Sequence, residues 1–121
     1  MEDVFKSFAT EIYRCGSHVG YHVKFKHVAP LCKKWSRNRL PDEERIQEMC
    51  DYYNSGGYIP RIIHIAELKD EGLVCYYGNH RREVLNRVQA LDAVCIVDVI
   101  FNATNDDVYQ SFLNVNKAVD V

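Results

Sequence analysis

The sequence predicts an α+β domain in which helices flank one small mixed β-sheet. Two patterns alternate along the chain: apolar residues three or four apart, typical of amphipathic helices, and apolar residues at every second position, typical of strands. They follow the order helix, strand, helix, strand, strand, helix, strand, helix, which is typical of α+β domains. With 121 residues, 47% of them hydrophobic, the chain is long enough for a single core.

The N-terminal third is predicted to hold one helix, one strand and a basic loop. Apolar residues recur at helical spacing over residues 4–14, which indicates a short amphipathic helix. Residues 19–25 alternate between apolar and polar side chains, which indicates a strand. Residues 31–41 are rich in Lys and Arg and are predicted to be a loop.

The clearest predicted helix follows this loop. Pro41 suits its first position, and the acids at residues 42–44 suit the positive end of the helix dipole. The glycine-containing stretch 54–57 ends it. Residues 58–68 then alternate as a strand does, and residues 73–77 are expected to return as an antiparallel partner.

The last third is predicted to hold two helices around a buried strand. Gly78 ends the preceding strand, and Asn79 is expected to cap the next helix. Residues 93–101 are the most hydrophobic stretch, which predicts a central strand. Thr104–Asp107 has the spacing of a capping box and opens the last helix. From Asn114 onward we expect an extended segment, and our hypothesis is that the chain is a fragment of a longer protein.

The net charge of −2 hides an uneven distribution. Residues 12–41 contain no acid and carry seven positive charges, so the rest of the chain must carry −9. The positive charges belong to Arg14, Lys24, Lys26, Lys33, Lys34, Arg37 and Arg39. Such a separation indicates contact with phosphate, nucleic acid or an acidic partner. The alternative is a solvated basic face balanced by acids elsewhere in the fold.

The five cysteines are odd in number and include no C-x-x-C pair. Cys50, Cys75 and Cys95 lie within apolar patterns, which favours reduced thiols in an intracellular protein, cytoplasmic or nuclear. No stretch approaches the roughly 18 apolar residues that a membrane span needs, so we expect no membrane contact.

Further cysteines and histidines lie close together in the first third: Cys15, His18, His22, His27 and Cys32. Their C-x2-H-x3-H spacing is compatible with zinc. However, His22 alternates with apolar residues on a predicted strand, and no second close pair follows. We therefore expect no metal site built from these side chains.

The stretch YYGNHRREVL, Tyr76–Leu85, puts a glycine and several polar residues between a strand and a helix. The first N–H groups of a helix lack partners and, with the helix dipole, attract anions. Arg81 and Arg82 are unfavourable in this turn by roughly 0.3–1 kcal/mol each unless an anion binds there, and guanidinium matches phosphate oxygens. The turn therefore predicts a phosphate site. The alternative is that both arginines pair with acids and His80 simply packs.

Two further roles can be assigned by residue type. His80 and Glu83 lie three apart on the predicted helix and are the candidates for a catalytic acid–base pair, with a surface contact as the alternative. Trp35, in its basic loop, is the best candidate to stack on a base.

The stretch GNHRREVL resembles the second motif of the ParB/sulfiredoxin-like superfamily, whose members place Gly-x-His-Arg or Gly-x-Arg-Arg between a strand and a helix. Residues 36–65 resemble the ParB amino-terminal pattern, and residues 93–121 resemble the closing strand and asparagine stretch of this group and of its DGQHR-type relatives. We accordingly divide one domain into residues 1–35, an N-terminal helix, strand and basic loop, and residues 36–121, the ParB/sulfiredoxin-like core.

This resemblance implies a domain that binds a nucleoside triphosphate, CTP or ATP, with Mg²⁺ bridging the phosphates. CTP acts as a clamp switch on DNA in some branches, ATP serves phosphoryl transfer in others, and some members have been called nucleases. The residues carried over for nucleotide or phosphate binding are Gly78, His80, Arg81, Arg37, Arg39, Asn114 and Asn116. Asn79 and Arg82 are added as members of the same predicted phosphate-binding turn.

The chain also departs from the family pattern. Asn79 stands where sulfiredoxins place their nucleophilic cysteine, so we expect no sulfinic-acid reduction. Tyr77 stands where DGQHR-like members often place Asp, which argues against a metal-binding or catalytic role at that position. We identify no helix-turn-helix region after the domain, so we do not expect this chain to be a complete DNA partition protein.

Three functions remain as hypotheses. The first is a nucleotide-binding, ParB-like domain with slow hydrolysis at most, since no strong general base is evident, linked to DNA transactions. The second is a DNA-binding or nuclease module, whose contacts would be Lys24, Lys26, Lys33, Lys34 and Trp35. The third is a protein-interaction domain that has lost ligand chemistry, and homodimerisation stays open in all three.

Overall fold

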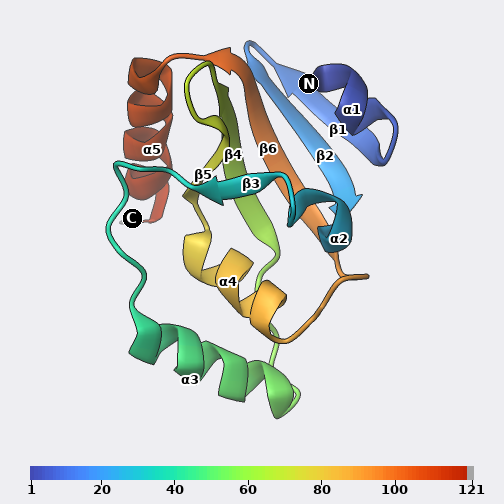
Figure 1. Cartoon of the computed structure of the whole chain (residues 1–121), viewed down its shortest axis with the longest axis vertical. Coiled ribbons are helices and arrows are strands. Elements are labelled where there is room, and N and C mark those ends of the chain that lie inside the picture. The colour runs from blue at the N-terminus through green and yellow to red at the C-terminus, as the bar shows by residue number, and fades with distance from the viewer. Residues whose placement is uncertain (120–121) are drawn as a thin grey trace.

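A six-stranded mixed sheet forms the centre of the structure, a computed structural model that describes residues 1–119 and the side chains up to Val115 (Figure 1). The strands are β1 (Ala9–Cys15), β2 (His18–Lys24), β3 (Cys32–Lys34), β4 (Ile62–Leu68), β5 (Gly72–Tyr77) and β6 (Val94–Ala103). The helices are α1 (Glu2–Lys6), α2 (Phe25–Val28), α3 (Glu43–Asn54), α4 (Asn79–Arg87) and α5 (Asn105–Val119). The α+β class predicted from the sequence is confirmed.

The strand order is β1-β2-β6-β4-β5-β3. Strand β6 pairs antiparallel with β2 and parallel with β4, so the most hydrophobic stretch is central, as predicted. The β4–β5 pair is antiparallel, as predicted, while β3 pairs parallel with β5. Strands from both halves of the chain therefore belong to one sheet.

Both faces of the sheet are covered in part. On one face, α1, α2 and α4 pack apolar side chains against alternate residues of the strands. On the other face, α5 packs Val108 and Phe112 near Trp35. Helix α3 packs Ile46 and Cys50 against Val84 of α4, and Figure 1 shows it beyond α4 at one end of the molecule.

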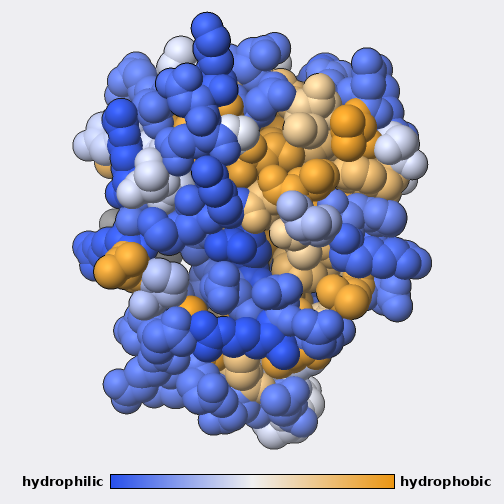
Figure 2. Space-filling view, viewed as in Figure 1, coloured by the Kyte–Doolittle hydropathy of each residue, from blue (hydrophilic) through white to orange (hydrophobic). Residues whose placement is uncertain are grey.

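The molecular surface differs between these regions. Figure 2 shows hydrophilic residues over α3, α4 and the segment that joins β3 to α3, whereas hydrophobic residues gather over β2, β6 and α2. Among residues 1–119, no helix combines the length and the apolar character needed to cross a bilayer.

The predicted helix over residues 4–14 is wrong beyond its first turn. Helix α1 ends at Lys6, and β1 begins at Ala9. Val4 and Ile12, two of the residues that gave the helical spacing, are about 40% exposed. Strand β2 lies antiparallel beside β1 through the Gly16–Ser17 turn, and this pairing outweighs the local helical pattern.

Two other predictions are corrected in the same way. The basic loop contains β3, whose three residues pair with β5. The segment after Asn114 is helical rather than extended, since α5 continues to Val119.

The helix ends show where local chemistry is decisive. The capping box is confirmed, because the Thr104 N–H donates to Asp107 Oδ2 at 2.9 Å and the Asp107 N–H donates to Thr104 Oγ1 at 3.1 Å. Helix α3 begins two residues later than predicted, with Asp42 as its N-cap and Pro41 outside it. The N-cap of α4 is Gly78 rather than Asn79.

Gly78 cannot be replaced without local strain. Its φ is +91°, and a Cβ there would lie 2.9 Å from the Ile62 carbonyl oxygen of β4. We expect Gly78→Ala to lower the free energy of unfolding by about 1–3 kcal/mol, measured by chemical denaturation.

Gly56→Ala is the matched control. Gly56 has φ +97°, but nothing lies within 4 Å of its Cβ position. Gly56→Ala therefore measures the cost of the left-handed backbone alone, and its loss of unfolding free energy should be smaller than that of Gly78→Ala. Equal losses in the two variants would contradict a steric role for Ile62.

Candidate functional site

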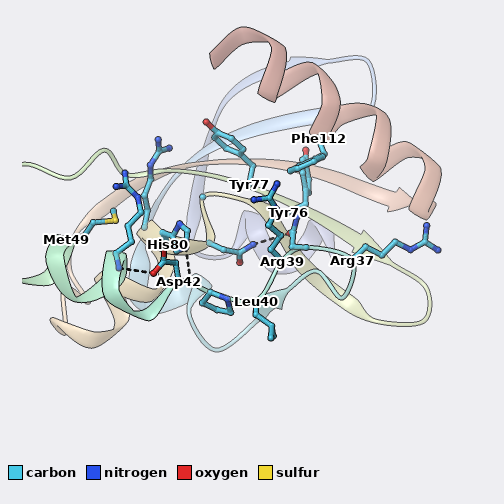
Figure 3. A pocket seen from close by; sticks show the side chains of 15 residues that line it. Arg37, Arg39, Leu40, Asp42, Met49, Tyr76, Tyr77, His80 and Phe112 are labelled. Atoms are coloured by element: carbon cyan, nitrogen blue, oxygen red, sulfur yellow. Dashed lines mark hydrogen bonds between the residues drawn. The ribbon is translucent and has the colours of Figure 1, made fainter. Parts of the chain in front are cut away.

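A cavity of about 680 Å³ opens where β5 ends and α4 begins (Figure 3). Its walls come from the segment between β3 and α3, the first half of α3, the β5–α4 turn and α5. The lining residues are Arg37, Asn38, Arg39, Leu40, Pro41, Asp42, Arg45, Met49, Tyr76, Tyr77, Gly78, Asn79, His80, Arg81 and Phe112. The structure thus brings the predicted GNHR turn together with the predicted Arg37 and Arg39.

The turn presents the start of α4 to this cavity. The first intrahelical hydrogen bond runs from the Arg82 N–H to the Gly78 carbonyl, at 2.9 Å. The N–H groups of Asn79, His80 and Arg81 precede it and have no acceptor within the helix. With the helix dipole they make this end of the cavity favourable for negative charge.

Four arginine side chains add positive charge to the same cavity: Arg37, Arg39, Arg45 and Arg81. None of them forms a salt bridge with a residue whose side chain the structure describes. Figure 3 shows Arg39 among the other lining side chains, whereas Arg37 extends away from them. The cavity is therefore cationic without an internal counter-charge on its arginines.

Arg81 is held in place by two contacts. One of its guanidinium nitrogens donates to the Ile62 carbonyl at 3.2 Å. Its Cζ lies 5.6 Å from the centre of the Tyr77 ring, a cation–π distance. These contacts leave other guanidinium N–H groups for a ligand, since arginine carries five.

Arg82 does not reach the cavity. It is mostly buried and donates through Nε and Nη2 to Asn79 Oδ1, at 3.3 Å each. The Asn79 amide in turn donates to the Cys75 carbonyl at 2.9 Å and to Asn38 Oδ1 at 3.2 Å. The predicted phosphate contacts of Arg82 are therefore wrong, because its guanidinium is bound to Asn79 within the turn and does not line the cavity.

His80 has a structural contact as well as a place in the cavity wall. Its Nε2 accepts the backbone N–H of Asp42 at 3.2 Å, which ties the start of α3 to α4. The predicted His80–Glu83 pair is not formed, because Glu83 lies beside Arg82 at 3.5 Å and Arg87 at 3.7 Å. His80 can offer Nδ1–H to a ligand, but it lacks the predicted acid–base partner.

One of the two late asparagines can be placed relative to the cavity. Asn114 is exposed on α5 and does not line the cavity. The side chain of Asn116 lies outside the described part of the structure. Phe112 is the residue that α5 contributes to the lining.

The lysines of the basic segment are spread over different surroundings. Lys24 and Lys26 lie 4.0 Å and 3.3 Å from Asp92. Lys34 Nζ donates to the Trp35 and Asn38 carbonyls, at 2.9 Å and 3.0 Å. It thus holds the shape of the loop between β3 and α3, which carries Arg37 and Arg39 and is called the arginine-bearing loop below. Lys33 is exposed. The alternative of acids balancing this charge is thus realised for two of these lysines.

Trp35 cannot offer a free ring face to a base. It is only 2% exposed, and its indole N–H donates to Asn105 Oδ1 at 3.0 Å. The expectation that it stacks on a nucleobase is wrong, because α5 covers this ring as part of the core. Tyr77 and Phe112, which are half-buried, provide the aromatic surface of the cavity instead.

Four of the five cysteines are core residues, and Cys15 is exposed. Cys32, Cys50, Cys75 and Cys95 are buried and unpaired. Burial raises the pKa of the Cys75 thiol to about 12, so the thiolate is not populated near neutral pH. Among the described side chains, no three His, Cys, Asp or Glu residues are arranged to hold a metal ion.

Sequence reasoning missed several lining residues, chiefly Asn38, Arg45 and Phe112. Arg45 is on the exposed face of an amphipathic helix, where a cation normally needs no explanation. Its role becomes visible only through the packing of α3 against α4. A local signal existed for Asn38 alone, which lies between the two predicted arginines.

Comparison with known proteins adds no relative. Searches against protein-family models, curated proteins and solved structures found no match. The resemblance to the ParB/sulfiredoxin-like superfamily therefore rests on the motifs alone.

Asn79 is expected to be the residue on which the shape of the turn depends. We expect Asn79→Ala to cost about 1–3 kcal/mol in unfolding free energy, because the buried Arg82 guanidinium loses its acceptor. Chemical denaturation measures this loss. Asn86→Ala, an exposed asparagine on the same helix, should change stability by less than about 0.5 kcal/mol. Similar effects for both would contradict the bracing role.

Proposed function

We propose that this domain binds a nucleoside triphosphate in the cavity between the β5–α4 turn and the arginine-bearing loop. The observation that carries the proposal is that four arginines, Arg37, Arg39, Arg45 and Arg81, line the cavity that opens at the start of α4. Guanidinium groups and helix N–H groups are the donors that phosphate oxygens select.

The cavity also has room and surface for the rest of a nucleotide. Its volume of about 680 Å³ falls within the range of roughly 300–1,000 Å³ typical of small-molecule sites. Tyr77 and Phe112, both half-buried, give it an aromatic side on which a base can stack. This division into a cationic part and an aromatic part supports a phosphorylated ligand with a ring.

Mg²⁺ fits this proposal as a companion of the nucleotide. The one carboxylate in the lining is Asp42, and its Oδ1 already accepts the Arg45 N–H at 3.2 Å. A metal would therefore be held mainly by phosphate oxygens and water, as Mg²⁺ often is. When bound, it would neutralise part of the phosphate charge.

Calorimetric titration with ATP, CTP, GTP and UTP in the presence of Mg²⁺ tests the proposal. We expect selective binding of one nucleotide or of a pair. Arg39→Ala and Arg81→Ala should each weaken it about 10- to 100-fold, as expected for loss of charge-assisted hydrogen bonds.

Arg87→Ala is the matched control, since Arg87 lies at the other end of α4 and pairs with Glu43 at 2.8 Å. It should leave the Kd unchanged within about twofold, because exposed ion pairs contribute little. A lack of binding to all four nucleotides would contradict the proposal. Salt-dependent binding of duplex DNA by the same protein would then favour the DNA-binding alternative.

A further inference from the structure

Strand β1 has an open outer edge. It is the first strand in the sheet order, and every residue from Thr10 to Cys15 is exposed. Among the described residues, only β2 forms backbone hydrogen bonds with this strand, and it does so from the inner side. Figure 1 shows β1 at one side of the sheet, with α1 next to it. The N–H and C=O groups of such an edge are able to pair with a further strand.

The opposite edge of the sheet is protected against such pairing. Strand β3 has only three residues, and two of them are the lysines Lys33 and Lys34. Short length and lysines are common means by which proteins keep sheet edges from associating. Strand β1 has seven residues and contains neither lysine nor proline. The sheet therefore offers one edge to a further strand.

Strand β1 is held firmly in place by a side chain that crosses its neighbour. Tyr13 lies over Gly20 of β2, where a Cβ would overlap the tyrosine ring. Its hydroxyl donates to the carboxylate of Asp98 on β6, which is 6% exposed. The edge is thus ordered before any partner arrives, which lowers the entropic cost of association.

Exposed apolar side chains gather along the same side of the molecule. Met1, Val4, Ile12 and Tyr13 are between 40% and 44% exposed. They belong to β1 and to α1 with its N-cap, which lie side by side and are joined by the Arg14–Glu2 ion pair at 2.9 Å. Exposed apolar side chains that lie together are typical of interaction surfaces.

Two opposite charges on β1 share one face of the sheet. Glu11 pairs with Tyr21 of β2. Arg14 pairs with Val19, and both of these β2 residues belong to the core on the α1 side. A bulge between the two charged residues places them on the same face although they are three positions apart. Their side chains form an ion pair at 2.7 Å and are still 46% and 42% exposed, so each keeps an open side for a further contact.

Antiparallel pairing of two β1 strands brings these charges together across a two-fold axis. With the axis between Ile12 and Tyr13, Glu11 of each copy lies opposite Arg14 of the other. An axis through Glu11 or through Arg14 would set like charges opposite each other, which is destabilising. The bulges of the two strands meet at the first axis, so both strands carry the extra residue at the same point and the pairing stays in phase on either side.

We propose that two copies of this chain associate through their β1 edges, so that the two six-stranded sheets join into one continuous sheet. Main-chain hydrogen bonds hold the strands together, and the contacts between Glu11 and Arg14 fix the register. Apolar side chains of α1 and β1 flank the junction. The same edge serves both copies and is used up, so the assembly closes at two chains. The protected β3 edges remain outermost.

Sedimentation equilibrium of the full chain, over a series of concentrations at low salt, measures this association. We expect a monomer–dimer equilibrium. Glu11→Arg and Arg14→Glu should each raise the dimer Kd about 10- to 100-fold, because each replaces two opposite-charge contacts by two like-charge contacts. Glu48→Arg is the matched control, with the same change of charge at an exposed position of α3. It should leave the Kd unchanged within about twofold.

An equal mixture of the two charge variants provides the sharpest comparison. In a mixed dimer, one strand carries only positive charges at positions 11 and 14, and the other carries only negative charges there. Every charge contact across the axis is then attractive, so the mixture should associate with a Kd near that of the wild type, although neither variant does so alone. Urea unfolding should give midpoints close to that of the wild type for both variants, because both positions are exposed.

Hydrogen exchange supplies an independent measurement. Amides of β1 should exchange more slowly at concentrations that favour the dimer, because the outer N–H groups gain partners. A chain that stays monomeric up to about 1 mM overturns the proposal, since even weak contacts are populated at that concentration. A dimer whose Kd neither charge variant changes, a mixture that fails to recover, or assemblies larger than two chains also overturn it.

Discussion

The side-chain amide of Asn79 joins β5, α4 and the loop that carries Arg37 and Arg39, and all three meet at the cavity. Its Nδ2 donates to the Cys75 carbonyl near the end of β5 and to Asn38 Oδ1 in the loop that carries Arg37 and Arg39. Its Oδ1 accepts from the Arg82 guanidinium in α4. Its interactions set the direction in which α4 leaves the sheet, and that direction brings the first N–H groups of the helix against the loop. The positive charge of the site thus depends on a neutral residue, because the hydrogen bonds of Asn79 hold together the segments that carry the arginines.

The sheet supplies a second constraint, centred on Asp98. A carboxylate in the middle of a hydrophobic strand is costly unless donors surround it. Tyr13 and His18 are such donors, and they come from the N-terminal hairpin rather than from the part of the chain that carries the family-like motifs. The hairpin is therefore more than an addition to the sheet edge. It allows a polar centre to exist beside the cavity and so connects the two halves of the sequence chemically as well as structurally.

Local patterns predicted much of this fold, and non-local pairing accounts for most errors. The helix after Pro41, the central strand and the capping box at Thr104 each depend on neighbouring residues, so the sequence alone revealed them. Strand β3 has no comparable signal, because its three residues become a strand only beside β5. For the same reason, only part of the cavity lining could be predicted from the sequence. The glycine-led turn is a local motif, but Arg45 reaches the cavity only through the packing of α3 against α4, which no short stretch of sequence reveals.

The two parallel strand pairs have a consequence for how the domain folds. Cys32 pairs with Leu73, 41 positions later, and Ile62 pairs with Ile96, 34 positions later. In each pairing a long loop must close, at a cost in chain entropy, before the stabilising contacts between the strands can form. Such topologies fold slowly. Since β3 leads into the loop that carries Arg37 and Arg39, we expect the cavity to assemble late, after the local β1–β2 and β4–β5 hairpins. Ligand-induced protection from hydrogen exchange would then appear only in molecules that have completed the whole sheet, so that nucleotide binding would report on finished folding.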